Sequence, residues 1–81
     1  MIMVHKFKDV PKNLTLEGLW DFARVGNFEV YTFKGTIESV GLRWGESKRL
    51  ERLGISRSKQ IQMLNWLEKH PTFVKENILY R

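Results

Sequence analysis

The residues with the clearest chemical potential are cations that crowd into one short stretch of the chain. Residues 43–59 hold six basic side chains against two acidic ones, whereas residues 1–42 hold five of each sign. The six cations are Arg43, Lys48, Arg49, Arg52, Arg57 and Lys59. The formal net charge of the chain is +5, and this stretch carries nearly all of it. A local surplus attracts a polyanion better than the same charge spread evenly, so the pattern predicts an anionic partner.

The middle of this stretch has the pattern of two helices joined by a tight turn. Leu50 and Leu53 are spaced to pack the first helix on the second, and Gly54 permits the positive φ that such a turn needs. Ile55 is expected to fill the angle between the helices, and Ser56 to cap the second one. The amide end of a capped helix carries partial positive charge, which suits a phosphate oxygen.

The second helix, predicted over 57–69, has an apolar and a polar face. Ile61, Leu64 and Leu67 share the face that we expect to be buried, with Met63 on its flank. The opposite face carries side chains suited to base edges and phosphates in a major groove, namely Ser58, Lys59, Gln62, Asn65 and Lys69. A solvated polar face without a partner is the alternative interpretation.

The run Leu53-Gly54-Ile55-Ser56-Arg57-Ser58 resembles two families of DNA-binding regulators, and the resemblance extends over residues 42–67. It is similar to the turn of helix-turn-helix proteins, where leucine-glycine-isoleucine-serine often precedes the recognition helix. It also resembles the turn of ribbon–helix–helix repressors, and Leu42-Arg43-Trp44 is similar to the ribbon of the Arc-type repressor. The resemblance to the Arc-type repressor implies a ribbon in the major groove and a phosphate at the start of the second helix.

These patterns predict a small DNA-binding regulator of transcription or recombination. Bases are expected to meet Ser58, Gln62 and Asn65, while the cations and the amides near Ser56 hold phosphates. The predicted nucleic-acid-binding residues are Arg43, Lys48, Arg49, Arg52, Ser56, Arg57, Ser58, Lys59, Gln62, Asn65 and Lys69. The expected partner is DNA, and the chain could act as a homodimer.

Two alternatives stay open. The first is a phage- or plasmid-encoded protein-interaction module that binds and modulates a host enzyme, because the same basic patch would steer that encounter. Its natural anchors are Trp66, Trp44 and Tyr80. The second is an RNA-binding protein that uses the patch together with aromatic residues of the predicted hairpin.

Other kinds of chemistry find no support in the sequence. The chain has no cysteine, so neither a disulfide framework nor a thiolate zinc site can form. His5 and His70 lie near opposite ends, and no spacing of carboxylates joins them into a metal site. There is no serine with an evident base partner, no paired-carboxylate motif and no glycine-rich phosphate loop. We therefore expect no enzymatic activity, no metal and no cofactor.

Composition predicts a folded protein away from membranes. Hydrophobic residues make up 42% and charged residues 28% of the chain, a balance typical of a globular domain rather than a disordered one. No apolar run reaches the ~18–20 residues of a membrane span, and the start of the chain turns polar too early for a signal peptide. We expect a cytoplasmic protein, in a bacterium or a phage-infected host cell, with no membrane partner.

The chain length and the pattern of helices, strands and turns predict one domain, 1–81, of the α+β class. A helix over 15–25, capped by Thr15, precedes a hairpin over 28–42 that turns at Lys34-Gly35. A strand over 2–8 could join the hairpin as its third strand. The helix-turn-helix-like unit follows, as helices over 46–53 and 57–69, and Thr72 is expected to cap a short terminal helix.

The aromatic residues of the hairpin allow two interpretations. Phe28, Tyr31 and Phe33 could stack on exposed bases, as sheet-based RNA binders do. Aromatics on a strand more often bury themselves against a helix, so we expect them to pack on the helix over 15–25.

Overall fold

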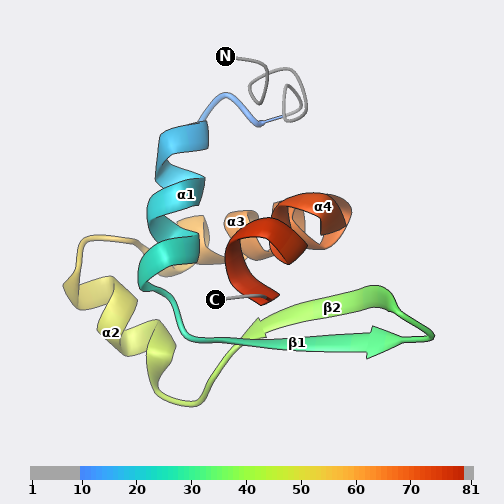
Figure 1. Cartoon of the computed structure of the whole chain (residues 1–81). Helices are drawn as coiled ribbons and strands as arrows, with labels where there is room; N and C mark the ends of the chain where they lie inside the picture. Colours follow the sequence, from blue (N-terminus) through green and yellow to red (C-terminus); the bar gives the residue numbers. More distant parts are fainter. Residues whose placement is uncertain (1–9, 80–81) are drawn as a thin grey trace.

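The computed structural model describes residues 10–79 of the chain. The elements are α1 (Leu16–Val25), β1 (Phe28–Phe33), β2 (Thr36–Leu42), α2 (Glu46–Arg52), α3 (Arg57–Lys69), α4 (Pro71–Val74) and the π-helical turn η2 (Lys75–Leu79). The fold is therefore of the predicted α+β class, with an N-terminal helix, an antiparallel hairpin and a helical C-terminal part (Figure 1). The predicted strand over 2–8 lies outside the described residues.

α1 begins where the sequence predicts, because Thr15 caps it. The Thr15 hydroxyl accepts a hydrogen bond from the backbone N–H of Gly18 at 2.9 Å, which satisfies one of the free amides of the first turn. Leu19 and Phe22 form its buried stripe and are fully buried in the core. Within the part of the chain that the structure describes, no helix is long and apolar enough to cross a membrane.

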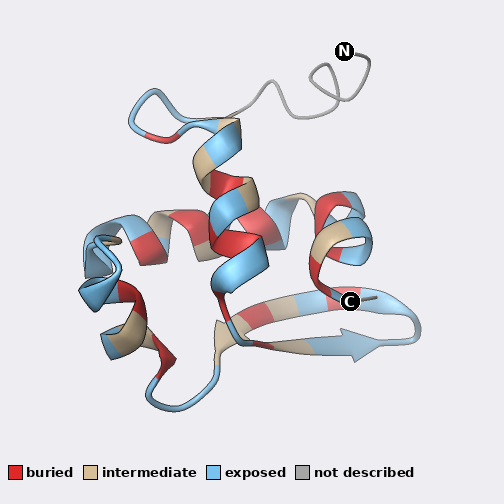
Figure 2. Cartoon of the chain, turned by 60° about the vertical axis from the view of Figure 1, so that its left-hand side comes forward, coloured by how far each residue is buried: buried red, intermediate tan, exposed pale blue. Residues whose placement is uncertain are grey.

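The hairpin is a two-stranded antiparallel sheet that turns at the predicted dipeptide. Lys34 and Gly35 both have positive φ, 52° and 79°, as a tight two-residue turn between twisted strands requires. The register is shifted between Tyr31 and Thr32, which marks a bulge near the tip. Figure 2 shows that the outer part of the hairpin, beyond the helices, is exposed.

Only one face of the hairpin is buried, so the prediction for its aromatic residues is partly wrong. Phe28 is buried and its ring meets that of Phe22 edge-on at 5.1 Å, as expected. Tyr31 and Phe33 instead remain 56% and 59% exposed. Successive side chains alternate between the two faces of a strand. Tyr31 and Phe33 lie on the face opposite to that of Phe28, and no helix covers that face in the outer half of β1.

α3 spans the predicted residues, but its buried face overlaps the predicted one only in part. Its buried residues are Gln60, Met63, Trp66 and Leu67, whereas Ile61 is 55% exposed. The physical reason is bulk: the Trp66 ring packs edge-on against Phe73 at 5.2 Å, and burying an indole removes more apolar surface from water than burying an isoleucine. The expected stripe is therefore confirmed at Leu67 and in part at Leu64, which packs against the core, and it is wrong at Ile61.

Two smaller expectations also need correction. Leu53 does not pack on α3 but is 56% exposed at the end of α2, where Leu50 alone reaches the core. Thr72 does not cap the terminal helix, because that helix begins one residue earlier, at Pro71. Proline suits the first helical position since its fixed φ is already helical and its missing N–H would have no partner there.

Candidate nucleic-acid interface

α2 is held in place by a buried acid and the arginine one turn after it. Glu46 is only 7% exposed, and its carboxylate accepts hydrogen bonds from the Asn27 N–H at 3.0 Å and the Arg49 guanidinium at 2.6 Å. The same guanidinium donates to the carbonyl oxygen of Val25 at the end of α1. Its hydrogen bond with Glu46 raises the pKa of Arg49. Arg49, a predicted nucleic-acid contact, therefore has its guanidinium engaged in the fold.

The second acid of this stretch is also matched by an arginine. The Nε of Arg57 lies 3.3 Å from a carboxylate oxygen of Glu51, and both side chains are largely exposed. A solvated pair of this kind contributes little to stability. It does, however, place the Arg57 charge beside the start of α3 and next to α2.

Four of the six predicted cations remain once these two pairs are set aside. Arg43, Lys48, Arg52 and Lys59 are exposed, and none of them forms an ion pair with an acid in residues 10–79. We refer to these four residues as the unpaired cations. Lys48 and Arg52 lie one turn apart on the outer face of α2, since they are four residues apart and the buried Glu46 and Leu50 point the other way.

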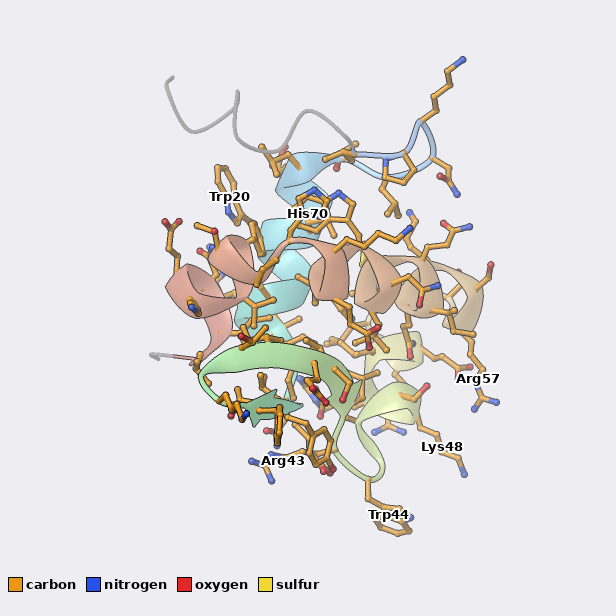
Figure 3. All side chains as sticks on the ribbon, turned by 90° about the vertical axis from the view of Figure 1, so that its right-hand side faces the viewer. Trp20, Arg43, Trp44, Lys48, Arg57 and His70 are labelled. Carbon is orange, nitrogen blue, oxygen red and sulfur yellow. The ribbon has the colours of Figure 1, made fainter. Side chains whose placement is uncertain are left out.

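The exposed indole of Trp44 directly follows Arg43 in the chain. Trp44 is 99% exposed in the turn between β2 and α2, where Gly45 takes a positive φ of 82°. In the view of Figure 3, Arg43, Trp44, Lys48 and Arg57 project along one margin of the molecule, and Trp20 and His70 lie away from it. The sequence identified Trp44 only as a residue of the ribbon-like run and as one of three protein anchors. Of the others, Trp66 is buried and Tyr80 lies outside the described residues.

The turn between α2 and α3 has the predicted geometry. Gly54 has a φ of 94°, and the Ser56 hydroxyl accepts a hydrogen bond from the Lys59 N–H at 3.2 Å. Ile55 is half-buried and packs against the core, as expected. The predicted N-cap and left-handed glycine are thus confirmed, and they present the start of α3 with Arg57 and Lys59 at the same end.

Gln60 is the residue of this unit that the sequence analysis missed. It is 1% exposed, and its amide nitrogen donates to the carbonyl oxygens of Ser47 at 3.1 Å and Ile55 at 2.8 Å. Its amide oxygen accepts a hydrogen bond from the Ser47 hydroxyl at 2.6 Å. One side chain therefore fixes α2, the turn and α3 relative to one another. The available signal was its spacing of three and seven residues from the buried Met63 and Leu67.

The residues of the predicted polar face of α3 divide into two groups. Ser58 is exposed in the first turn of α3, close to the unpaired cation Lys59. Further along, Gln62, Asn65 and Lys69 line an open hollow of about 440 Å³ between α3 and the loop before α1. Asn13 of that loop donates a hydrogen bond to the amide oxygen of Gln62 at 2.5 Å. The structure therefore places Ser58 with the unpaired cations and sets the other three beside the loop.

No protein-family model, curated protein or solved structure matches the chain at a significant level.

Proposed function

We propose that this protein binds nucleic acid through the unpaired cations, with duplex DNA as the first partner to test. The observation that carries the proposal is the division of charge within residues 43–59. Glu46 and Glu51 each form an ion pair with an arginine, which leaves four exposed cations without an acidic partner among residues 10–79. Cations of this kind neutralise phosphates and release condensed counterions, which is the main source of affinity in sequence-independent binding.

The arrangement suits contact with a phosphate backbone. Lys48 and Arg52 present two charges from one face of α2, and the capped start of α3 adds its amide dipole with Lys59 beside it. Gln60 holds the two helices in a fixed relation, so these charges are presented on a rigid support. Ser58 is the side chain best placed to approach a base edge from the same helix end.

The direct test is fluorescence anisotropy of a labelled DNA duplex, a DNA single strand and an RNA at several salt concentrations. The proposal expects binding at about 50 mM salt that weakens steeply towards about 200 mM, with log K falling linearly against log salt. If all four unpaired cations meet phosphates, the slope for duplex DNA is about −4. Absence of binding to every probe at micromolar protein and low salt would contradict the proposal. Tighter binding of RNA than of duplex DNA would select the RNA-binding alternative.

A protein partner is the second candidate, and the exposure of Trp44 specifically favours it. A fully exposed indole just before α2, with Leu53 exposed just after the end of that helix, is the kind of side chain that anchors protein interfaces. Capture of a bacterial protein that survives nuclease treatment and is lost in the Trp44→Ala variant would support this candidate. Ile61→Ala is the control for the loss of an exposed apolar side chain, because Ile61 is 55% exposed on α3.

A further inference from the structure

The rest of the molecule covers the two edges of the hairpin differently. On the outer side of β2, the Val40 N–H points away from β1 and donates to a carboxylate oxygen of Glu68 on α3 at 3.2 Å. Figure 1 shows β2 between β1 and the C-terminal helices. The outer edge of β2 is therefore satisfied and covered within the chain.

β1 has backbone groups on its outer side that nothing in the described chain satisfies. The Arg43 N–H donates to the Asn27 carbonyl at 2.9 Å, so Asn27 and Arg43 form a hydrogen-bonded pair. In an antiparallel ladder every second pair of facing residues is hydrogen-bonded in this way, and the pairs between them direct their backbone groups outward. Phe28 and Val30 then direct their N–H and C=O groups away from β2. Thr32 does the same, because the two-residue turn makes Phe33 and Thr36 a bonded pair. Residues 10–79 contain no hydrogen-bond partner for these outward groups.

The side chains along β1 add an apolar surface to this open edge. Tyr31 and Phe33 lie on the outward face, 56% and 59% exposed, opposite the small Ser39 and Thr36 of β2. An exposed apolar edge strand is a template for pairing with another chain. The unsatisfied backbone groups of β1 and the exposed Tyr31 and Phe33 rings together indicate that a further strand pairs with β1.

We infer that this strand is β1 of a second copy of the chain, paired antiparallel across a two-fold axis to give a four-stranded sheet. The strand is complementary to itself, because Glu29 lies near its beginning and Lys34 follows its last residue. Antiparallel pairing centred on Tyr31 sets Glu29 of each copy opposite Phe33 of the other, whose ring centroid lies 5.4 Å from the Lys34 ammonium, whereas parallel pairing would align like charges. An axis at Tyr31 pairs Val30 with Thr32 of the second copy through the outward backbone groups and sets the two Tyr31 rings side by side.

This inference does not rest on the proposed nucleic-acid binding, since Lys48, Arg52 and Lys59 lie on α2 and α3, and Arg43 is the one unpaired cation close enough to act on Tyr31 of β1. The competing occupant of the edge is the strand predicted over residues 2–8, which lies outside the described residues. That intramolecular pairing would leave the protein monomeric, so the state of association separates the two possibilities.

The test is analytical ultracentrifugation of the full chain over a series of protein concentrations. The expected mass rises to that of a dimer with concentration. Phe33→Ser removes an exposed ring at the edge and should raise the dissociation constant by about tenfold. Ile61→Ser is the matched control, because Ile61 is similarly exposed, at 55%, on α3 and should leave the constant unchanged. Val30→Pro removes one outward N–H, which an edge strand tolerates, and should give a monomer with an unchanged circular dichroism spectrum.

A monomer at every concentration would overturn the inference. So would a dimer that Ile61→Ser weakens as much as Phe33→Ser does, because the contact would then lie on α3. If Val30→Pro unfolds the chain, the comparison of the two serine variants still decides the outcome, since both replace exposed side chains.

Discussion

A few polar side chains at buried positions determine how the basic segment is presented. Gln60 and Glu46 are buried: Gln60 makes three hydrogen bonds to Ser47 and Ile55, and Glu46 accepts hydrogen bonds from the Asn27 N–H and from Arg49 of its own helix. A buried polar group without such partners would cost free energy, so these bonds are required wherever the residues are buried. Binding and stability are therefore carried by different residues: Gln60 and Glu46 fix the helices that present the unpaired cations, but they are not themselves exposed.

Gln60→Ala should destabilise the protein by about 3 kcal/mol. The change removes a buried side chain and leaves the carbonyl oxygens of Ser47 and Ile55 without their donor. The free energy of unfolding in urea measures the effect. Gln62→Ala is the control, because that amide is only partly buried and bonds to the exposed Asn13, so its loss should cost less than about 1 kcal/mol. Equal losses in the two variants would contradict the role given to Gln60.

Glu29→Gln should lower the pKa of Tyr31. The Tyr31 hydroxyl donates to the Glu29 carboxylate, and this hydrogen bond, with the negative charge, raises the pKa of Tyr31 above its usual value. The nearby charge of Arg43 acts weakly in the opposite direction. Arg43→Gln should therefore raise the same pKa. Titration of the Tyr31 ring signals by nuclear magnetic resonance measures both changes, and an unaltered pKa in Glu29→Gln would show that the two groups do not interact in solution.

The bounds of the elements could be predicted from sequence because local chemistry fixes them. Thr15 and Ser56 cap their helices, Gly54 takes the left-handed conformation, and Lys34-Gly35 makes the hairpin turn, each through contacts within a few residues. The rotation of α3 about its own axis could not be predicted in this way. It depends on which side chains fit the space between the other helices, and there Trp66 displaced Ile61 from the core.

Gly54→Ala should destabilise the unit formed by α2 and α3 by about 1–2 kcal/mol. At a φ of 94° a Cβ atom is strained, although nothing lies within 4 Å of its position. Gly41→Ala is the matched control, because its surroundings are equally open and its φ lies outside the left-handed region. The unfolding free energy of the control should stay within about 0.5 kcal/mol of the parent protein. A harmless Gly54→Ala would mean that the turn can adopt another conformation.

At the scale of the whole molecule, charge is divided between structure and surface. Charge counting along the sequence predicted the basic stretch, but it could not predict which arginines would pair with Glu46 and Glu51, since that depends on where the acids point after folding. Nor could it predict that Asn13 would contact Gln62, because the two residues are far apart in the chain. The unpaired cations are therefore fewer than the six basic residues that the sequence pointed to.

The proposed binding of nucleic acid depends on the position of the cations and not on the total charge of the chain. The most direct measurement compares duplex binding against salt for two double variants of equal net charge: Lys48→Gln with Arg52→Gln, and Lys12→Gln with Lys75→Gln. All four side chains are exposed, but only the first pair lies on the outer face of α2. We predict that the first variant reduces the magnitude of the salt slope by about 2, while the second keeps the parent slope. An equal reduction in both variants, or none in the first, would contradict the claim.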